Sequence, residues 1–408
     1  MKKVDVLIVG GGILAWVLAQ RISRLNTVKS AVIISSRELH TSSLRNQSWL
    51  QSGLLYNLDD SVEREVAELC IFHGRKLMDL RNERMLRQAA IMAVKSEEEA
   101  EKKISFLRAH GFIYPNHYLN TNEAREKLGN DFLNSESYSK GSKFIWTPDQ
   151  PFDEGGLLRF CEDSISFANF KFSSIKGNAV LKKNALTKNG YSVQVDNEEF
   201  DPGVLFVLTG LNTIRFLEPL GIEENIKIKA RRCVLMKSLN FIDLKVPIFI
   251  NKINNTNINT VKDLSGKKLH LLGDSIYTPV ENIHQLPKDM NVTTQDKELF
   301  LQNFCQSGGY PDLKSKLELF LEDDNNFSVC YKTESAAYLP WIYDSNTFDQ
   351  CGYKNIYMAG PGKATLAFHT ATELLRIAKL GEGIEQTSQL RTNGNSEIKM
   401  WFEEKQTK

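Results

Sequence analysis

The chain has 408 residues, of which 41% are hydrophobic, and 51 basic against 50 acidic side chains give it a formal net charge of +1. This composition excludes a disordered, collagen-like or disulfide-scaffold chain, and the lack of a basic excess argues against a nucleic-acid partner or an anionic membrane surface. Because single hydrophobic cores stop growing near ~250–300 residues, we expect about two domains.

The six cysteines lie far apart without a CxxC pair, and the histidines do not cluster at metal-ligand spacing. We therefore predict a reduced, cytoplasmic protein without a metal site. The most apolar stretch, residues 4–19, contains Asp5 and three successive glycines. It is expected to be a folded element and not a membrane span or a signal peptide.

The first predicted elements form a βαβ unit. Residues 4–9 are a short apolar strand, a glycine turn follows, and Ile13, Val17 and Ile22 recur near helical spacing. Residues 31–34 supply the second strand. Such a unit builds a parallel sheet with a right-handed crossover.

The next segments alternate between helical and strand patterns. Amphipathic spacing predicts helices around 61–83 and 96–110. A further helix is expected after the two prolines of the TPDQP segment. Residues 191–195 and 204–210 have the pattern of strands that return to the first sheet.

The C-terminal half predicts a second domain and then a return to the first. Residues 231–335 contain scattered β-type runs and an amphipathic segment around 296–322, which favours an antiparallel sheet with helices. Residues 355–360 and 363–380 repeat the order of strand, glycine turn and helix. The predicted fold class is α/β, with a Rossmann-like domain and a second α+β domain built on an antiparallel sheet.

The glycine turn carries the first chemical signal. Gly10, Gly12 and Ala15 form a GxGxxG/A pattern between the first strand and the first helix. The first glycine permits the tight turn, the second lets the backbone approach a pyrophosphate, and the small third residue allows close packing of helix on strand. The N-terminus of the helix, at Ile13, would offer oriented N–H groups to the phosphates.

The end of the second strand usually carries an acid that binds a ribose, but here it has Ser35 and Ser36, followed by Arg37. Serines can hydrogen-bond a ribose, and an arginine would favour a 2′-phosphate. The alternative is a solvated loop. The turn alone therefore leaves the choice between FAD and NADP open.

Beyond this turn, several segments resemble the FAD-dependent D-amino-acid oxidase superfamily, the group of glycine oxidase, sarcosine oxidase and L-2-hydroxyglutarate dehydrogenase. The similar segments are SSLRNQSWLQSGLLY (42–56), TPDQPFDEGGLLRF (147–160), GNAVLKKN (177–184), VLFVLTGLNT (204–213) and AGPGKATLAFHTATELL (359–375). The first is closest to the hydroxyglutarate dehydrogenase branch, where a histidine usually stands in the place of Gln51.

The resemblance implies FAD as the cofactor and a set of residues that hold it. The implied FAD-binding residues are Gly10, Gly12, Ile13, Ala15, Ser35, Ser36, Arg37, Ser43, Arg45, Asn46, Gln51, Ser52, Val180, Thr209, Gly210, Gly360, Gly362, Lys363, Ala364 and Thr365. Electrostatics supports the C-terminal part, because a helix N-terminus with Lys363 beside it would stabilise the negative charge of a reduced flavin. The alternative is an ordinary helix with a basic first turn.

The implied catalytic residues are Tyr331, Lys332, His369 and Gln51. Tyr331 and Lys332 would hold a substrate carboxylate at the flavin face, although the family often has arginine followed by proline here, and lysine cannot give the same bidentate grip. His369 would face the flavin or the substrate, or would be structural.

Three further features have two interpretations each. Cys330 lies in a context similar to that in which the sarcosine oxidase branch attaches FAD covalently, but a lone cysteine on a strand is usually a small buried residue. Arg231 and Arg232 could form an anion clamp or be solvated. The LLGDS segment (271–275) resembles a mark of aromatic-hydroxylase flavoproteins, but Pro279 disfavours the helix that follows it there, so we predict a hairpin turn.

We therefore expect an FAD-dependent oxidoreductase that takes a hydride from the C–H of a small amine, amino acid or 2-hydroxy acid and passes electrons to oxygen or another acceptor. The FAD domain would comprise 1–85, 145–230 and 340–408, and the substrate domain 86–144 and 231–339. The alternatives are an NAD(P)H-dependent flavin monooxygenase and a non-catalytic binding protein on the same fold. The oligomeric state is left open.

Overall fold

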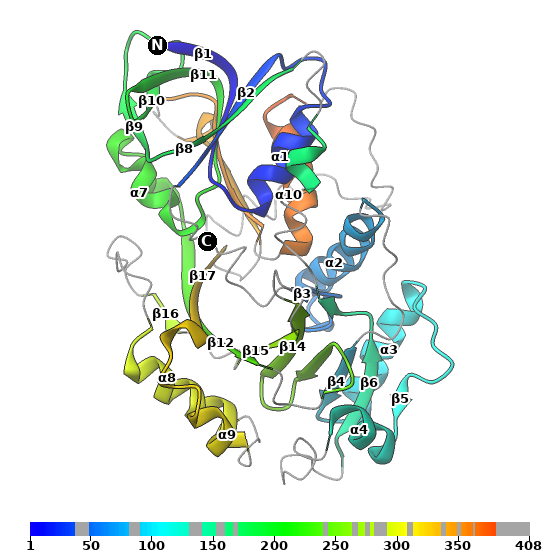
Figure 1. Ribbon diagram of the computed structural model, residues 1–408. Coiled ribbons are helices and arrows are strands. Elements are labelled where there is room, and N and C mark those ends of the chain that lie inside the picture. The colour runs from blue at the N-terminus through cyan, green and yellow to red at the C-terminus, as the bar shows by residue number, and fades with distance from the viewer. Residues whose placement is uncertain are drawn as a thin grey trace.

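The computed structural model describes residues 1–36, 49–80, 90–129, 141–151, 160–165, 170–239, 244–262, 268–273, 278–280, 292–307, 313–335, 340–348, 352–361 and 364–380. The described part contains two large sheets, one in the upper and one in the lower half of Figure 1. Helices cover both, which confirms the predicted α/β class.

The first sheet is parallel at its centre. In spatial order its path is β18 (Trp341–Asp344), β19 (Ile356–Gly360), β11 (Glu198–Val207), β1 (Lys2–Val9), β2 (Ser30–Ser35) and β8 (Lys171–Lys176). The five strands from β19 to β8 are parallel, and β18 is antiparallel to β19. An antiparallel extension, β10 (Tyr191–Val195) and β9 (Ala179–Lys183), pairs with β11.

Burial on both faces explains the uninterrupted apolar sequence of β1. Val6 and Ile8 pack on the side of α1 (Ile13–Ile22) and α10 (Ala367–Ile377), and Leu7 and Val9 pack on the other side. Nine of the ten residues of α1 are buried because the helix lies between the sheet and α10 (Figure 1). This packing fixes the glycine turn between β1 and α1.

The second sheet joins strands from two distant parts of the chain. Its path is β16 (Thr278–Pro279), β12 (Ile228–Leu239), β15 (Lys268–Gly273), β14 (Thr256–Lys262), β13 (Ile248–Asn251), β4 (Ala90–Val94), β6 (Lys143–Thr147) and β5 (Tyr118–Leu119), and β17 (Phe327–Ser335) also pairs with β12. It is antiparallel except between β13 and β4. A small third sheet pairs β3 (Trp49–Leu50) with β7 (Gln150–Pro151).

The remaining helices of the described residues are α2 (Ser61–Leu80), α3 (Glu97–Ala109), α4 (Thr121–Leu128), α7 (Thr213–Leu217), α8 (Thr294–Leu301) and α9 (Lys314–Glu318).

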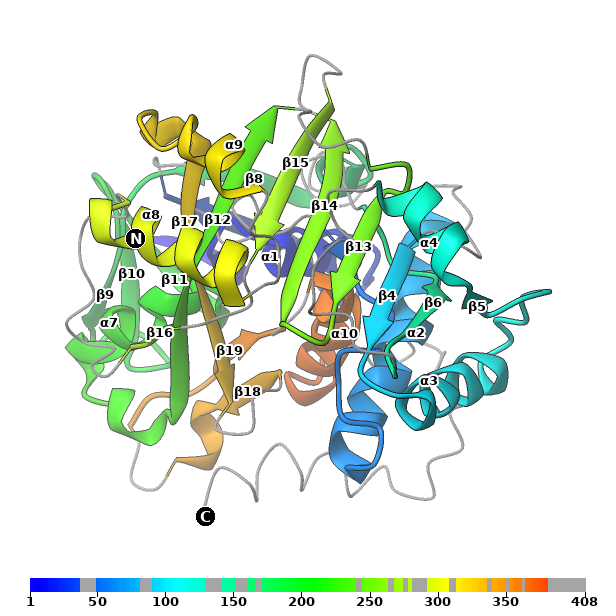
Figure 2. The ribbon, with the colours of Figure 1, turned by 90° about the horizontal axis from the view of Figure 1, so that it is seen from below.

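The second sheet has an outer and an inner face. In the view from below, α8 and α9 lie in front of the β12 and β17 end (Figure 2), where Phe300 packs against Met236 and Phe327 of the outer face. The inner face is turned toward the first sheet, and there Ile248 and Ile250 pack with Leu54.

The amphipathic segment 296–322 contains α8, a π-helical turn at Gln302–Ser307 and α9, in agreement with the helices expected there. The predicted C-terminal helix differs from the observed one. The C-terminal helix begins at Ala367 and not at 363, after a 3₁₀ turn at Ala364–Leu366.

Candidate functional site

The candidate site begins where the parallel strands end. Gly10 has a φ of 138°, a backbone angle that residues other than glycine rarely adopt. A Cβ atom there would overlap the carbonyl oxygen of Leu208. The Gly10 N–H donates to the carbonyl of Ile34 at 2.8 Å, and the Leu208 N–H donates to Val9 at 2.8 Å. The glycine turn is therefore fixed between the ends of β2 and β11.

The N-terminus of α1 opens from this turn. Gly12 is the N-cap residue, with no side-chain cap, and the first turn contains no acidic residue. Ala15 is fully buried, as expected for the third small residue of the motif. The partial positive charge of this helix end therefore has no carboxylate of its own turn beside it, which suits a bound phosphate.

The predicted ribose-side residues lie around the same edge. Ser35 ends β2, and its Cβ is so close to Gly11 that a Cβ on that glycine would lie 2.7 Å away. Ser36 is exposed. The Gly177 N–H donates to the Ser35 carbonyl at 2.9 Å, which brings the start of β9, with the half-exposed Val180, next to the end of β2.

The turn after β11 completes this edge. Thr209 precedes the 3₁₀ turn Gly210–Asn212, and its hydroxyl lies 3.1 Å from the Thr213 hydroxyl. Gly210 has a φ of 58° with open space where a Cβ would stand. The structure thus brings together the predicted residues of the glycine turn, β2 and β11. The predicted residues Arg37, Ser43, Arg45, Asn46, Gly362 and Lys363 lie outside the described residues.

The segment after β3 contacts the C-terminal turn. The backbone N–H of Gln51 donates to the Thr365 hydroxyl at 3.3 Å, and both residues are buried. Within the described residues, the side-chain oxygen of Gln51 is buried and has no hydrogen-bond partner. A buried acceptor of this kind is costly unless a ligand or water donates to it. Ala364 begins the 3₁₀ turn that carries Thr365.

A buried carboxylate, which the sequence analysis did not identify, holds this segment. Asp149 accepts from the Ser52 N–H at 2.8 Å, the Ser52 hydroxyl at 2.7 Å, the Thr147 hydroxyl at 2.7 Å and the Trp49 indole N–H at 3.0 Å. Burial raises the pKa of Asp149, and these donors oppose the shift. Ser52, a predicted FAD-binding residue, therefore positions the backbone through Asp149.

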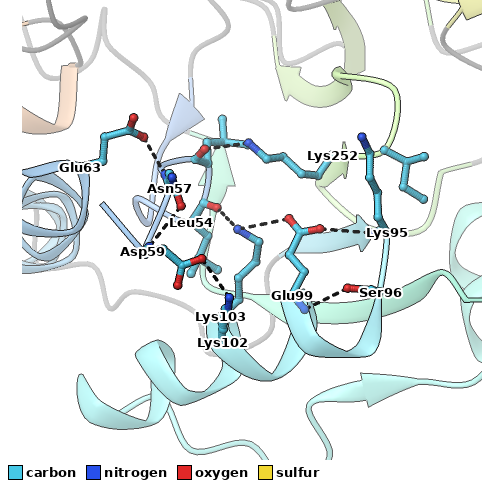
Figure 3. A network of polar contacts seen from close by, with 12 residues as sticks. Leu54, Asn57, Asp59, Glu63, Lys95, Ser96, Glu99, Lys102, Lys103 and Lys252 are labelled. Carbon is cyan, nitrogen blue, oxygen red and sulfur yellow. Dashed lines mark hydrogen bonds and ion pairs between the residues drawn. The ribbon is translucent and has the colours of Figure 1, made fainter. Parts of the chain in front are cut away.

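Two lysines fix the next turn of the same segment (Figure 3). Lys103 Nζ donates to the Leu54 carbonyl at 2.6 Å, and Lys252 Nζ donates to the Leu55 carbonyl at 2.8 Å. Glu99 Oε1 lies 3.7 Å from Lys103 Nζ. Burial, followed by the charge of Lys252, lowers the pKa of Lys103 to about 8. Helix α3 and the turn directly after strand β13 thus support the segment that begins at Gln51.

At the end of β19, Gly360 is required by a neighbouring ring. A Cβ on Gly360 would overlap the indole of Trp341. The Trp341 N–H is buried and has no hydrogen-bond partner within the described part of the chain. The last residue of β19 therefore lies directly against a tryptophan of β18.

The predicted pairing of Tyr331 and Lys332 as one clamp is wrong. The two residues are neighbours on β17, so their side chains point to opposite faces of the sheet. Tyr331 packs on the outer face with Val234 and Val292, in a cluster that also includes Leu211 of the turn after β11. Lys332 is directly opposite Arg231 in the register of β12 and β17, and both side chains belong to the inner face.

For the same reason, Arg231 and Arg232 cannot form one anion clamp. Arg232 lies on the outer face, where Asp296 in the first turn of α8 binds its guanidinium with two hydrogen bonds, one of 2.6 Å. These hydrogen bonds raise the pKa of Arg232. On the inner face, Arg231 makes an ion pair with the buried carboxylate of Glu334.

The inner face also reaches Tyr56, which the sequence analysis did not single out as a site residue. Burial raises the pKa of Tyr56 well above its usual value, and Cys70 and Glu334 add to this effect while Arg231 opposes it. Tyr56 packs against the cluster of Leu69, Cys70 and Leu366. The signal in the sequence was its position five residues after Gln51, at the end of the segment 42–56 that resembles the flavin-contacting segment of the oxidase superfamily.

His369 lies between two helices. Its ring centre is 5.0 Å from that of His73 on α2. Burial lowers the pKa of His369, so its neutral form is favoured. Its Nε2 has no hydrogen-bond partner among the described residues. The contact with α2 supports the structural interpretation, and the catalytic role stays a prediction.

The LLGDS motif lies partly in the second sheet. Residues 271–273 belong to β15, between β12 and β14, and Asp274 and Ser275 lie outside the described residues.

No helix in the described ranges has the length and apolar character needed to cross a membrane. Those ranges also contain no group of three or more histidine, cysteine or acidic residues that could hold a metal ion.

Comparisons with known proteins give matches only at the level of structure. The sequence matches no family model and no curated protein. The structure is similar to glycine oxidase from Geobacillus kaustophilus, with a TM-score of 0.63 and 15% identity over 93% of this chain and 95% of that one. It is also similar to iminodiacetate oxidase from Chelativorans sp. BNC1, with a TM-score of 0.65 and 14% identity over 92% and 95% of the chains.

A dehydrogenase has the same architecture. L-proline dehydrogenase from P.horikoshii gives a TM-score of 0.61 and 14% identity over 93% of each chain. The chain therefore has the fold of these amine and amino acid oxidoreductases along nearly its whole length. The predicted resemblance to the D-amino-acid oxidase superfamily is confirmed for the fold.

Proposed function

We propose that this chain binds FAD and oxidises the C–H bond next to nitrogen in a small amine or amino acid. The observation that carries the proposal is the combination of this fold with a glycine turn, an uncapped helix N-terminus and two strand ends at one edge of the parallel sheet. Dinucleotides bind at such an edge in related architectures.

The described residues fit FAD. Gly10 and Gly12 with the first turn of α1 would hold the pyrophosphate, and Ser35 would hydrogen-bond the ribose. Gln51 and Thr365 would meet the flavin, because the buried Gln51 oxygen lacks a donor and lies beside the C-terminal turn. When bound, FAD supplies the two-electron chemistry. The chain orients the substrate and excludes water.

The inner face of the second sheet offers the substrate contacts. Lys332 would attract a substrate carboxylate, and the ion pair of Arg231 and Glu334 on the same face would bind polar groups. The similar structures are a glycine oxidase, an iminodiacetate oxidase and an L-proline dehydrogenase, which favours a substrate with a CH–NH group for this chain as well. A 2-hydroxy acid is the second candidate, and oxygen or another acceptor would reoxidise the flavin. We also propose a cytoplasmic location, because the six cysteines lie far apart in the sequence and form no CxxC pair.

An absorbance spectrum tests the cofactor, and anaerobic bleaching tests the reaction. We expect a flavin spectrum in the purified or FAD-incubated protein and loss of the oxidised-flavin band on adding a small amino acid. Protein that stays colourless with FAD would favour the non-catalytic alternative. Rapid bleaching by NADPH, without bleaching by amines or amino acids, would favour the monooxygenase.

Two neighbouring variants test the substrate side. Lys332→Met should raise KM for an acidic substrate at least ~10-fold, the usual scale of a charge-assisted contact, without loss of flavin. Tyr331→Phe should leave KM unchanged, because this side chain lies on the outer face. Equal effects of the two variants would contradict the assigned faces.

A further inference from the structure

Two cysteines far apart in the sequence face each other across adjacent strands. Cys233 on β12 and Cys330 on β17 are directly opposite in the antiparallel register. Both are buried, their sulfur atoms are 2.9 Å apart, and the Cys233 thiol donates to the Cys330 carbonyl at 3.3 Å. Neither thiol has a part in the proposed function.

The register meets the geometric requirement of a disulfide. Residues directly opposite in antiparallel strands have Cα atoms about 4.5–5.5 Å apart, and disulfides need about 4.4–6.8 Å. The sulfur–sulfur distance of 2.9 Å is short for two thiols. It is longer than a disulfide bond, which is about 2.05 Å, so the two sulfur atoms are not bonded. A small rotation of the two side chains would close the bond without moving either strand.

The surroundings favour oxidation of this pair. Residues two apart on a strand share a face, so Arg231 and Lys332 stand on the same face as the two cysteines, two residue pairs along the register. Lys332 places a positive charge on the face of the thiolate that attacks during oxidation, whereas the charge of Arg231 is paired with Glu334. Cys305 is equally buried but lies in the core beneath α8, where burial raises its thiol pKa to about 11.

We propose that Cys233 and Cys330 form a reversible disulfide, a two-electron modification site on the inner face of the second sheet. With hydrogen peroxide as the oxidant, the two thiols lose their hydrogen atoms, a sulfur–sulfur bond forms, and the peroxide is reduced to two molecules of water. A dithiol reductant reverses the step. The bond links β12 to β17 next to Arg231 and Lys332, and its formation does not depend on bound FAD.

Peptide mapping of the full-length protein tests the proposal. The reduced, folded protein is treated with hydrogen peroxide or diamide, alkylated in denaturant and digested. We expect a cross-linked peptide pair containing Cys233 and Cys330, lighter by two hydrogen atoms and lost after dithiothreitol treatment. Protein oxidised while unfolded should instead give a mixture among its six cysteines. Complete alkylation of both residues after native oxidation would overturn the proposal, as would a flavin bound covalently to Cys330.

Thermal unfolding provides a second measurement. The bond would close a loop of 97 residues, so oxidation should raise the Tm by several degrees. Cys233→Ala should abolish both the cross-link and the rise in Tm, whereas the matched variant Cys305→Ala should keep both. If Cys233→Ala fails to fold, the peptide map of the native-sequence protein still decides the matter. An oxidation-dependent Tm rise that persists in Cys233→Ala would contradict the assignment to this pair.

Discussion

Lys103 shows how a buried charge can serve the architecture of a site. Its side chain is 4% exposed, and its ammonium group donates to the Leu54 carbonyl, three residues after Gln51 (Figure 3). Burying an ammonium group is unfavourable, and the nearby Lys252 adds repulsion, which Glu99 only partly offsets. The buried charge of Lys103 therefore lowers the free energy of unfolding, and the size of this effect depends on pH.

The pKa of Lys103 predicts the sign of this dependence. Between pH 8 and 10.5 the unfolded chain binds more protons at this lysine than the folded chain does, so its cost to stability disappears as the pH rises through this window. The free energy of unfolding, relative to Lys103→Met, should therefore rise by up to about 3 kcal/mol from pH 8 to 10.5 and stay flat below pH 8. Denaturant unfolding at a series of pH values measures it.

The adjacent residue provides the control. Lys102 on the same helix is exposed, and its hydrogen bonds to Asp59 and Glu98 raise its pKa. Lys102→Met should therefore not reproduce the rise with pH. The same pH profile in both variants would show that the effect belongs to the helix surface and not to the buried ammonium group.

At the scale of the elements, the turn between β1 and α1 predicts different effects for two glycines. Gly10→Ala should cost about 3 kcal/mol or more, because it adds an unfavourable φ to an overlap with the Leu208 carbonyl. It should also remove bound FAD. Gly221→Ala, at a φ of 72° with open space around it, should cost only about 1 kcal/mol and leave FAD bound. Unfolding curves and flavin content measure both, and a Gly10→Ala protein with full FAD content would refute the placement.

The predicted elements were correct where local signals decide the structure. The β1–α1–β2 unit, α2 and α3 follow from apolar spacing and turn residues, which act over a few positions. The sites on β12 and β17 were harder, because alternation shows that Arg231 and Arg232 point to opposite faces but not which face is inward. That depends on the packing of α8, whose Asp296 binds Arg232. Asp149 could not be identified, because three of its four donors come from Trp49 and Ser52, nearly 100 residues earlier in the chain.

At the scale of the whole molecule, each large sheet is assembled from distant parts of the chain. The first sheet takes strands from 2–35, 171–207 and 341–360, and the second joins β4, β5 and β6 to strands from 228–335. Such pairings depend on long-range packing, which sequence patterns do not specify. The expected division into domains stays a prediction.

This assembly predicts how FAD should change the unfolding of the protein. The proposed contacts lie on pieces that meet only when the first sheet is complete: the glycine turn, Ser35, the turn after β11 and Thr365. A ligand that binds only the folded state stabilises it, by about 2.7 kcal/mol when the free ligand is 100 times its Kd. Saturating FAD should therefore raise the Tm by several degrees.

ADP provides the matched comparison, because it has the pyrophosphate and adenosine but no flavin. It should raise the Tm less than FAD does, since it cannot reach Gln51 and Thr365. Equal shifts would show that only the nucleotide edge at Gly10 and Ser35 binds, and no shift with FAD would argue against the whole site. If calorimetry resolves two transitions, FAD should move the one that Gly10→Ala also moves, because both act on the first sheet.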